Sequence, residues 1–163
     1  RPLRRDAEMI GDIIHEALSH VDRRAAEHEM RVELEDDMLM ANMDARLIVQ
    51  VIINIVNNAV KYTPEGSDIC LSAKKENSMV RIEIADNGPG ISDEAKQRLF
   101  DMFYTVNTGS AGADSRRGLG LGLSLCKSIV EAHSGSITVH DNQPHGSVFS
   151  FTLPLEEVKI QNV

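Results

Sequence analysis

The sequence has few of the features that mark several common classes of protein. Only two cysteines occur among its 163 residues, Cys70 and Cys126, and they are far apart and outside any C-x-x-C spacing. This favours buried, reduced thiols in a reducing cytosol over a disulfide framework. The six histidines form no H-E-x-x-H or comparable pattern, which argues against a zinc site. No apolar run approaches the roughly 18 residues that span a bilayer, so no membrane segment is expected.

Basic residues are also scarce. Seventeen Lys and Arg against 25 Asp and Glu give a formal net charge of -8, and no broad basic stripe is present. Because phosphate backbones are bound mainly by clustered Lys and Arg, no nucleic-acid partner is expected, and any polyanion must be bound locally. The length suits one domain. The start at Arg1-Pro2-Leu3, without an initiator Met, indicates a fragment of a longer polypeptide.

Hydrophobic periodicity predicts helices and strands in mixed order. Apolar spacings of three and four predict a helix over residues 6–24 and another over 44–62, which Asp44 can cap. Strands are predicted over 31–35, 38–43, 68–74, 79–85, 136–140 and 147–153, with a hairpin turn at 76–78. This order predicts an α/β (α+β) two-layer sandwich, with a mixed β-sheet packed on about three helices, rather than an alternating parallel βαβ fold.

The segment after the second hairpin strand has three parts. A short helix capped by Ser92 is predicted to end near Phe100. Residues 101–117 are poor in apolar residues and rich in Gly, Ser and Ala, which we interpret as a mobile lid. A helix over 118–133 follows, and Gly135 is placed to end it. Its buried face is predicted from the spacing of Leu121, Leu125, Ile129 and Ala132.

Polar side chains interrupt the apolar face of the helix over 44–62. Asn58 lies seven residues beyond Val51 and therefore projects in nearly the same direction, with Asn54 and Lys61 one turn to either side. A buried amide is costly unless it is hydrogen-bonded, and a hydrated metal or a phosphate would supply the partner. The alternative is an ordinary boundary between the apolar stripe and solvent.

An acidic residue ends the strand over 79–85. Asp86 shares the parity of Val80, Ile82 and Ile84, which places its carboxylate on the core-facing side. There it could accept a hydrogen bond from the exocyclic amine of adenine, whereas guanine would present a carbonyl and be repelled. The alternative is that Asp-Asn-Gly-Pro-Gly is only favourable turn chemistry, with Gly88 and Gly90 at positive φ.

The run Gly118-Leu-Gly-Leu-Gly-Leu123 opens a helix whose free amides favour bound phosphate. A Rossmann loop is the alternative, but that loop must follow a strand, and here the preceding residues are lid-like. No P-loop motif occurs. Arg116 and Arg117 could add positive charge at the phosphates, or could be solvated lid residues.

Together, these features resemble the ATP-binding catalytic domain of sensor histidine kinases, within the wider gyrase, heat-shock chaperone and mismatch-repair ATPase superfamily (the Bergerat fold). Residues 54–62 resemble the N box and 86–90 the first glycine box. Residues 99–103 resemble the phenylalanine box and 118–123 the second glycine box. The resemblance covers about residues 31–155.

Further details of the resemblance bear on subfamily and boundaries. Residues 114–123 are similar to Kdp-type, potassium-responsive sensor kinases, and Ser147 stands where Thr is usual in the closing strand. His15-Glu16 is not followed by the Leu-Arg-Thr-Pro pattern of the phosphoacceptor. Residues 1–30 are therefore predicted to be the segment connecting to absent acceptor helices. The catalytic domain is predicted over 31–157, with a tail over 158–163.

The resemblance also implies ligands and residue roles. ATP and Mg²⁺ would be the cofactors, with the amide oxygen of Asn58 as the metal ligand. Asn54, Lys61 and Arg117 would be catalytic by orienting water or phosphate and neutralising phosphate charge, and Phe100 and Phe103 would flank the lid. The nucleotide-binding residues would be Asn54, Asn58, Lys61, Tyr62, Asp86, Gly88, Gly90, Ile91, Phe103, Arg116, Gly118, Leu119, Gly120, Leu121, Gly122, Leu123 and Ser147.

The first N-box position distinguishes three functions. Related ATPases carry Glu there to activate water, whereas Asn54 cannot act as a general base. The resemblance therefore implies phosphoryl transfer to a histidine on a separate dimerisation domain. A response regulator would act downstream of a homodimeric kinase. This fragment would be a cytoplasmic domain of a membrane-bound bacterial protein, with no membrane contact of its own. The alternatives are a water-directed ATPase and a nucleotide-gated interaction module without transfer activity.

Overall fold

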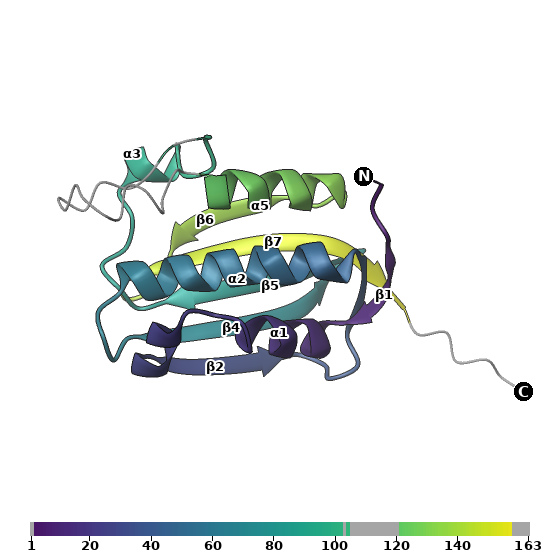
Figure 1. Cartoon of the computed structure of the whole chain (residues 1–163), viewed down its shortest axis with the longest axis horizontal. Helices are drawn as coiled ribbons and strands as arrows, with labels where there is room; N and C mark the ends of the chain where they lie inside the picture. Colours follow the sequence, from purple (N-terminus) through teal and green to yellow (C-terminus); the bar gives the residue numbers. More distant parts are fainter. Residues whose placement is uncertain (1, 103, 105–120, 158–163) are drawn as a thin grey trace, which may run out of the picture.

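A computed structural model describes residues 2–102, 104 and 121–157, with only the backbone of Leu121 described. One mixed sheet forms the first of two layers (Figure 1). Its strand order is β1-β3-β7-β5-β4-β2, and β6 also pairs with β7. The strands are β1 (Asp6–Met9), β2 (Glu29–Leu34), β3 (Met40–Met43), β4 (Asp68–Glu76), β5 (Met79–Asp86), β6 (Ile137–Asp141) and β7 (Ser147–Glu156).

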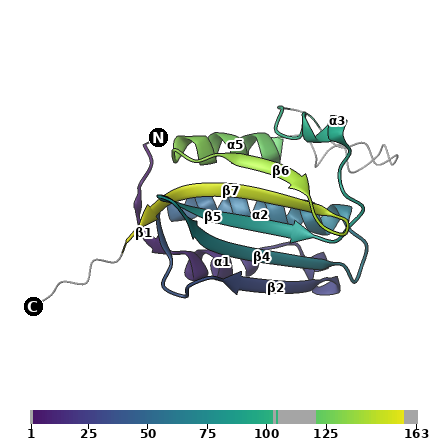
Figure 2. The same cartoon turned by 180° about the vertical axis from the view of Figure 1, so that it is seen from behind.

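The second layer consists of helices on one face of the sheet, as the view from behind shows (Figure 2). The helices are α1 (Ile10–Leu18), α2 (Ala45–Tyr62), α3 (Asp93–Lys96) and α5 (Leu121–Ala132), with a 3-10 turn, η1, at Arg23–Glu27. The strands of the β4–β5 hairpin are antiparallel and β2 pairs with β4 in parallel. The predicted two-layer α/β architecture is therefore confirmed. None of the helices in the described ranges is long and apolar enough to cross a membrane.

Alternation along the central strands builds the core between the layers. On β5, Val80, Ile82 and Ile84 point toward the helices and are fully or almost fully buried, while the residues between them are partly exposed. On α2, Ile48, Ile52 and Ile55 meet them from the other side. Because each strand and helix presents a single apolar face, the sheet and helix layer can pack only in this orientation.

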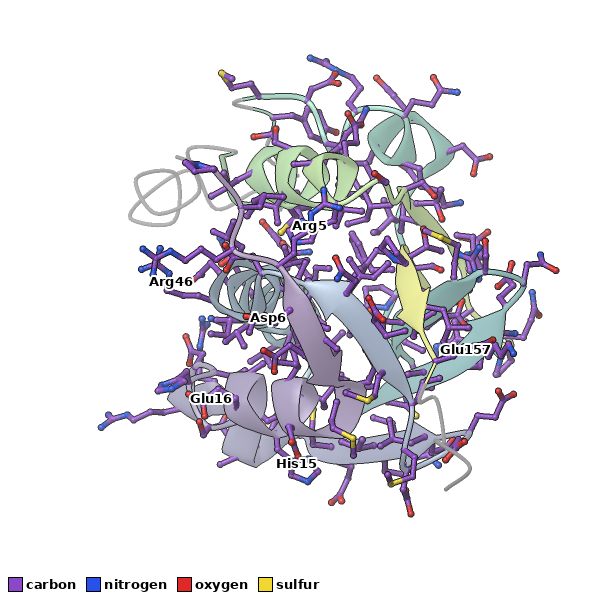
Figure 3. All side chains as sticks on the ribbon, turned by 90° about the vertical axis from the view of Figure 1, so that its right-hand side faces the viewer. Arg5, Asp6, His15, Glu16, Arg46 and Glu157 are labelled. Carbon is purple, nitrogen blue, oxygen red and sulfur yellow. The ribbon has the colours of Figure 1, made fainter. Side chains whose placement is uncertain are left out.

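The N-terminal segment differs from the sequence prediction. Residues 6–24 do not form one helix: β1 pairs antiparallel with β3, and the helix occupies only Ile10–Leu18 before η1 begins. Ile10, Ile14 and Ala17 are nevertheless fully buried in the shared core. In Figure 3, His15 and Glu16 lie on the outer side of α1, while Arg5 and Asp6 lie where β1 begins. The connecting role of residues 1–30 stays a prediction.

The buried face of α5 also differs from the prediction. Leu125 is 49% exposed and Ala132 is exposed, whereas Cys126, Val130 and His133 are fully buried. Ile129 is the one member of the predicted face that is described and buried. The α5 sequence carries two overlapping apolar arcs, and packing against α2 selects the one centred on Cys126 and Val130.

Two predicted caps need correction. Gly135 does not supply the left-handed residue after α5, because Ser134 does, at φ 63°. Gly135 is instead required by close packing, since a Cβ there would lie 1.9 Å from the Thr152 carbonyl oxygen. Asp44 occupies the N-cap position of α2, but its side chain makes no capping hydrogen bond and accepts one from the Arg4 N–H at 3.1 Å. The predicted Ser92 cap is present, since its Oγ accepts from the Ala95 N–H.

Candidate functional site

A cavity of about 300 Å³ is lined in part by residues of α3 and its flanking turns. Figure 1 shows α3 near one end of the sheet. Its walls come from four places: the last turns of α2, the turn after β5, α3 and the start of β7. Apolar side chains dominate the lining and few polar groups interrupt it, as is usual for a small-molecule site. The lining residues are Asn58, Ala59, Tyr62, Thr63, Asp86, Pro89, Gly90, Ile91, Ser92, Ala95, Leu99, Ser147 and Phe149.

Asp86 is the only acidic residue among those lining residues, and it is 7% exposed. Its Oδ1 accepts hydrogen bonds from the backbone N–H groups of Gly88 at 2.9 Å and Ser147 at 3.3 Å. Burial raises the pKa of this carboxyl above its ordinary value, and the two backbone donors partly oppose that shift because they favour the charged form. The inward orientation expected from strand parity is confirmed, and Asp86 is fixed in direction by the backbone.

The turn after β5 depends on close backbone approaches. Gly90 adopts φ 83°, as predicted, but Gly88 is absent from the residues at positive φ. A Cβ at Gly88 would instead lie 2.6 Å from Thr63 Cγ2, so this glycine serves close contact with the end of α2. Gly146 adopts φ 114°, and a Cβ there would lie 1.9 Å from the Asp86 carbonyl oxygen. The β6–β7 loop can therefore lie directly against Asp86 only because residue 146 is glycine.

The last turns of α2 contribute an amide and an aromatic ring. Asn58 and Tyr62 both line the cavity, four residues apart on one face of the helix. The Asn58 side chain makes no hydrogen bond to another described residue, although neighbouring Asn57 accepts one from the Asp22 N–H at 2.7 Å. The half-buried Asn58 thus presents to the cavity an amide with no hydrogen-bond partner among the described residues.

Two predicted site residues on α2 lie outside the cavity lining. Asn54 Oδ1 accepts a hydrogen bond from Gln50 Nε2 at 2.8 Å, and its amide also contacts the thiol of Cys126. Burial raises the pKa of that thiol to about 12, so Cys126 stays protonated and inert. The Lys61 ammonium lies 5.2 Å from the centroid of the Tyr62 ring. Both residues continue the α2 stripe away from the cavity on either side of Asn58.

The second glycine box and the lid fall largely outside the described residues. This applies to Phe103, Arg116, Arg117, Gly118, Leu119 and Gly120. For Leu121 only the helical backbone is described. Gly122 is exposed near the start of α5, and Leu123 packs partly buried against the core. Phe100, before the lid, packs edge-on against Phe149 with ring centroids 6.3 Å apart.

Several lining residues were not singled out from the sequence. Thr63 and Ala95 belong to the walls although nothing in their local pattern points to a site. Thr63 is held by two contacts of its hydroxyl group, which donates to the Ala59 carbonyl and approaches His28 Nε2, both at 2.8 Å. His28 lies 35 residues earlier in the chain, so no sequence spacing could have paired the two.

Comparison with known proteins assigns the chain to a family. Residues 43–157 match the histidine kinase-, DNA gyrase B- and HSP90-like ATPases. The chain belongs to this family, and its relatives place it among the ATP-binding catalytic domains of sensor histidine kinases. Sensor protein KdpD of Clostridium acetobutylicum is 40% identical over 154 residues, which is 94% of this chain and 17% of KdpD. Adaptive-response sensory kinase SasA of Gloeothece citriformis is 36% identical over 143 residues, 86% of this chain and 35% of SasA.

Solved structures agree with this assignment. The catalytic domain of histidine kinase ThkA superposes with a TM-score of 0.81 at 28% identity, covering 93% of this chain and 96% of that one. ThkA in complex with the response regulator protein TrrA gives a TM-score of 0.75 at 27% identity, covering 92% of this chain and 41% of that one. The resemblance to sensor histidine kinases, including Kdp type, is therefore confirmed. Because the chain spans only 17% and 35% of the curated relatives, it corresponds to one part of such proteins.

Proposed function

We propose that this chain binds magnesium ATP in the cavity and supplies the phosphoryl group for a histidine on a separate dimerisation domain. The observation that carries the proposal is the buried Asp86 carboxylate, fixed by two backbone donors at the base of an apolar cavity. Such a carboxylate can accept from the exocyclic amine of adenine. The apolar walls formed by Ile91, Leu99 and Phe149 suit the faces of a flat base.

The residues present also fit a magnesium ion bound together with the nucleotide. Asn58 offers a neutral amide oxygen with no competing partner among the described residues, and Mg²⁺ prefers a few protein oxygens combined with phosphate oxygens and waters. No cluster of three or more acidic, His or Cys ligands exists in the described ranges, so the nucleotide itself must complete the coordination. When bound, the ion would neutralise phosphate charge during transfer.

The polar stripe on α2 supports the proposal of transfer rather than hydrolysis. The Asn54 side chain is an amide and not a carboxylate, so it cannot act as a general base that removes a proton from water. Its oxygen also already accepts a hydrogen bond from Gln50. Lys61 adds positive charge on the same stripe. These residues can orient and neutralise phosphate groups, while the nucleophile must come from elsewhere. Arg117 and the glycine run at 118–120 are proposed to complete the phosphate side.

The chain matches only part of longer sensor kinases, which bears on its proposed partners. Since the chain matches 17% of a sensor protein, its acceptor histidine, the homodimer interface and a membrane anchor are proposed to lie in other parts of the full polypeptide. A response regulator is proposed as the downstream partner, because ThkA is known in complex with TrrA. This catalytic part is proposed to act on the cytoplasmic side.

Calorimetry with Asp86→Asn tests the nucleotide site. Asn retains an oxygen for Gly88 and Ser147 but removes the charge, so affinity for magnesium ATP is expected to fall roughly 10- to 100-fold, as for loss of a charge-assisted hydrogen bond. Glu83→Gln is the matched control, because Glu83 lies on β5 with the opposite parity and its side chain points away from the core. Equal affinity in the Asp86 variant and the wild type would reject the site.

Mixing the chain with the separately prepared helical domain of its own kinase and labelled ATP tests the transfer. Label on a histidine of that domain is the expected result. Binding without label would support the nucleotide-gated module instead. Steady phosphate release by this chain alone would identify a water-directed ATPase.

A further inference from the structure

Lys96 connects α3, which contributes to the cavity wall, with the end of β6. It lies on α3, and its ammonium pairs with Asp93 at 2.9 Å and with Asp141 at 2.7 Å. The Lys96 side chain is 17% exposed, whereas those of Asp93 and Asp141 are 95% and 60% exposed. The two carboxylates raise the pKa of Lys96, with the Asp141 hydrogen bond as the largest cause. The ammonium is therefore always charged at neutral pH.

The two ion pairs have different mechanical consequences. Asp93 belongs to α3 itself, so its pair with Lys96 only closes one helical turn. Asp141 is the last residue of β6, so its pair with Lys96 joins α3 to the β6–β7 loop. α3 has only four residues, and a helix that short has no independent stability. Its position must therefore be set by contacts outside the helix.

The β6–β7 loop is in turn attached to the turn that carries Asp86. Asn142 Nδ2 donates to the Asp86 carbonyl oxygen at 2.9 Å, and His145 Nδ1 donates to the Gly88 carbonyl oxygen at 3.0 Å. The close approach of Gly146 to Asp86 adds a third contact. The loop is thus fixed relative to Asp86, and any group bound to Asp141 is fixed relative to Asp86 as well.

We propose that Lys96 is a positioning residue whose ion pair with Asp141 fixes α3 against the β6–β7 loop and so sets the width of the nucleotide cavity. The inference rests on the proposed function. Ala95 and Leu99, beside Lys96, line the cavity from the α3 side, and Asp86 and Ser147 line it from the end of β5 and the start of β7. Without the ion pair, α3 can move away from the end of β6. Contacts between the α3 side of the cavity and the base of the nucleotide would then weaken. Because these walls are proposed to contact the base, ATP and ADP are expected to be affected alike.

The test compares four variants of this chain by calorimetry with ATP and with ADP. Lys96→Met and Asp141→Asn are each expected to weaken both nucleotides about two- to fivefold, the range of a partly exposed ion pair. The combined variant is expected to lose no more than either single change, because one interaction is removed in all three. Lys96→Arg, which keeps the charge, is expected to retain most of the affinity.

Two controls separate the proposal from a general effect of lost charge. Asp93→Asn removes the other ion pair of Lys96, which has a similar N–O distance but lies within α3. This variant is expected to keep nucleotide affinity within twofold of wild type. Lys75→Met breaks the exposed pair with Glu157 at the far end of β4 and should have no effect on binding. If Asp93→Asn matches Asp141→Asn, or if the single losses add in the combined variant, the inference is overturned. If the wild type binds no nucleotide, the proposed function fails with it.

Discussion

The two ends of the cavity are built in different ways. At the Asp86 end the functional group is fixed by backbone donors from two separate segments, and a further loop lies against it through Gly146. At the Asn58 end the amide has no partner among the described residues, although it sits on the long, well-packed α2. One end is therefore preorganised before any ligand binds, while the amide at the other end stays open to a ligand.

This difference has an energetic reason. A charged carboxylate in an apolar cavity is costly unless its hydrogen bonds are already made, so the fold supplies them from the backbone. Leaving a neutral amide without a hydrogen bond at the cavity edge costs far less free energy, so its partner can be a metal ion or a phosphate that binds later. Changes at the Asp86 end should therefore affect both stability and binding, whereas changes at the Asn58 end should affect binding alone.

Gly146→Ala should disrupt the preorganised end and give the largest effect. The new Cβ would lie 1.9 Å from the Asp86 carbonyl oxygen at a φ of 114°, so the loop must move away from Asp86. We expect a loss of roughly 3 kcal/mol or more in the free energy of unfolding, together with loss of nucleotide binding. Urea unfolding followed by far-UV circular dichroism measures the first, and calorimetry the second.

Gly66→Ala is the matched control for that change. Gly66 also has a positive φ, 88°, but a Cβ added there would meet no atom within 4 Å. Backbone strain alone should lower the free energy of unfolding by roughly 1–2 kcal/mol and leave nucleotide affinity unchanged. Similar losses in the two glycine variants would mean that the contact with Asp86 is unimportant.

Asn58→Ala tests the other end of the cavity. We expect affinity for ATP to fall about tenfold in the presence of magnesium, since the proposed metal ligand is lost, and to change little when magnesium is chelated. The free energy of unfolding should stay within about 0.5 kcal/mol of the wild type. Asn57→Ala should lower the free energy of unfolding and leave nucleotide affinity unchanged. The Asn57 side chain accepts a hydrogen bond from the Asp22 N–H and does not line the cavity. A magnesium-independent loss in the Asn58 variant would contradict the proposed role.

The pH dependence of binding gives the smallest effect. Burial raises the folded-state pKa of Asp86, so between its ordinary value and the raised one the folded protein binds more protons than the unfolded chain. The stability contributed by this group therefore falls as pH rises through that window. Conversely, as pH falls through the raised pKa the carboxylate is progressively neutralised, which should weaken its proposed hydrogen bond to adenine, so we expect affinity to begin to fall across that window. Calorimetry across this range should show no such inflection in Asp86→Asn.

Much of the site was predictable because its signals are local. The parity of Asp86 with Ile82 and Ile84 predicted its inward orientation, and the helical spacing from Val51 predicted that Asn58 would project in nearly the same direction as that core residue. Both predictions use a repeat of two or 3.6 residues, which the backbone imposes on any strand or helix. The structure brings the two residues into one cavity.

The errors arose where a local signal was ambiguous. Residues 6–9 form a strand only because β3 offers an edge more than 30 residues later, and the apolar spacing alone continued the helix across them. The face of α5 could be centred on Leu125 or on Val130, and packing against α2 decided it. The contact of Thr63 with His28 and that of Lys96 with Asp141 join segments that no sequence repeat relates.

Residue spacing along a regular backbone was enough to establish the strands of the sheet other than β1, the inward direction of Asp86 and the amide stripe on α2. Three features emerged only from the folded chain: which glycines are required by close contact, which arc of α5 is buried and which ion pair joins α3 to the β6–β7 loop. Those features depend on distances between segments far apart in the chain, and such distances are fixed only when the whole core is packed.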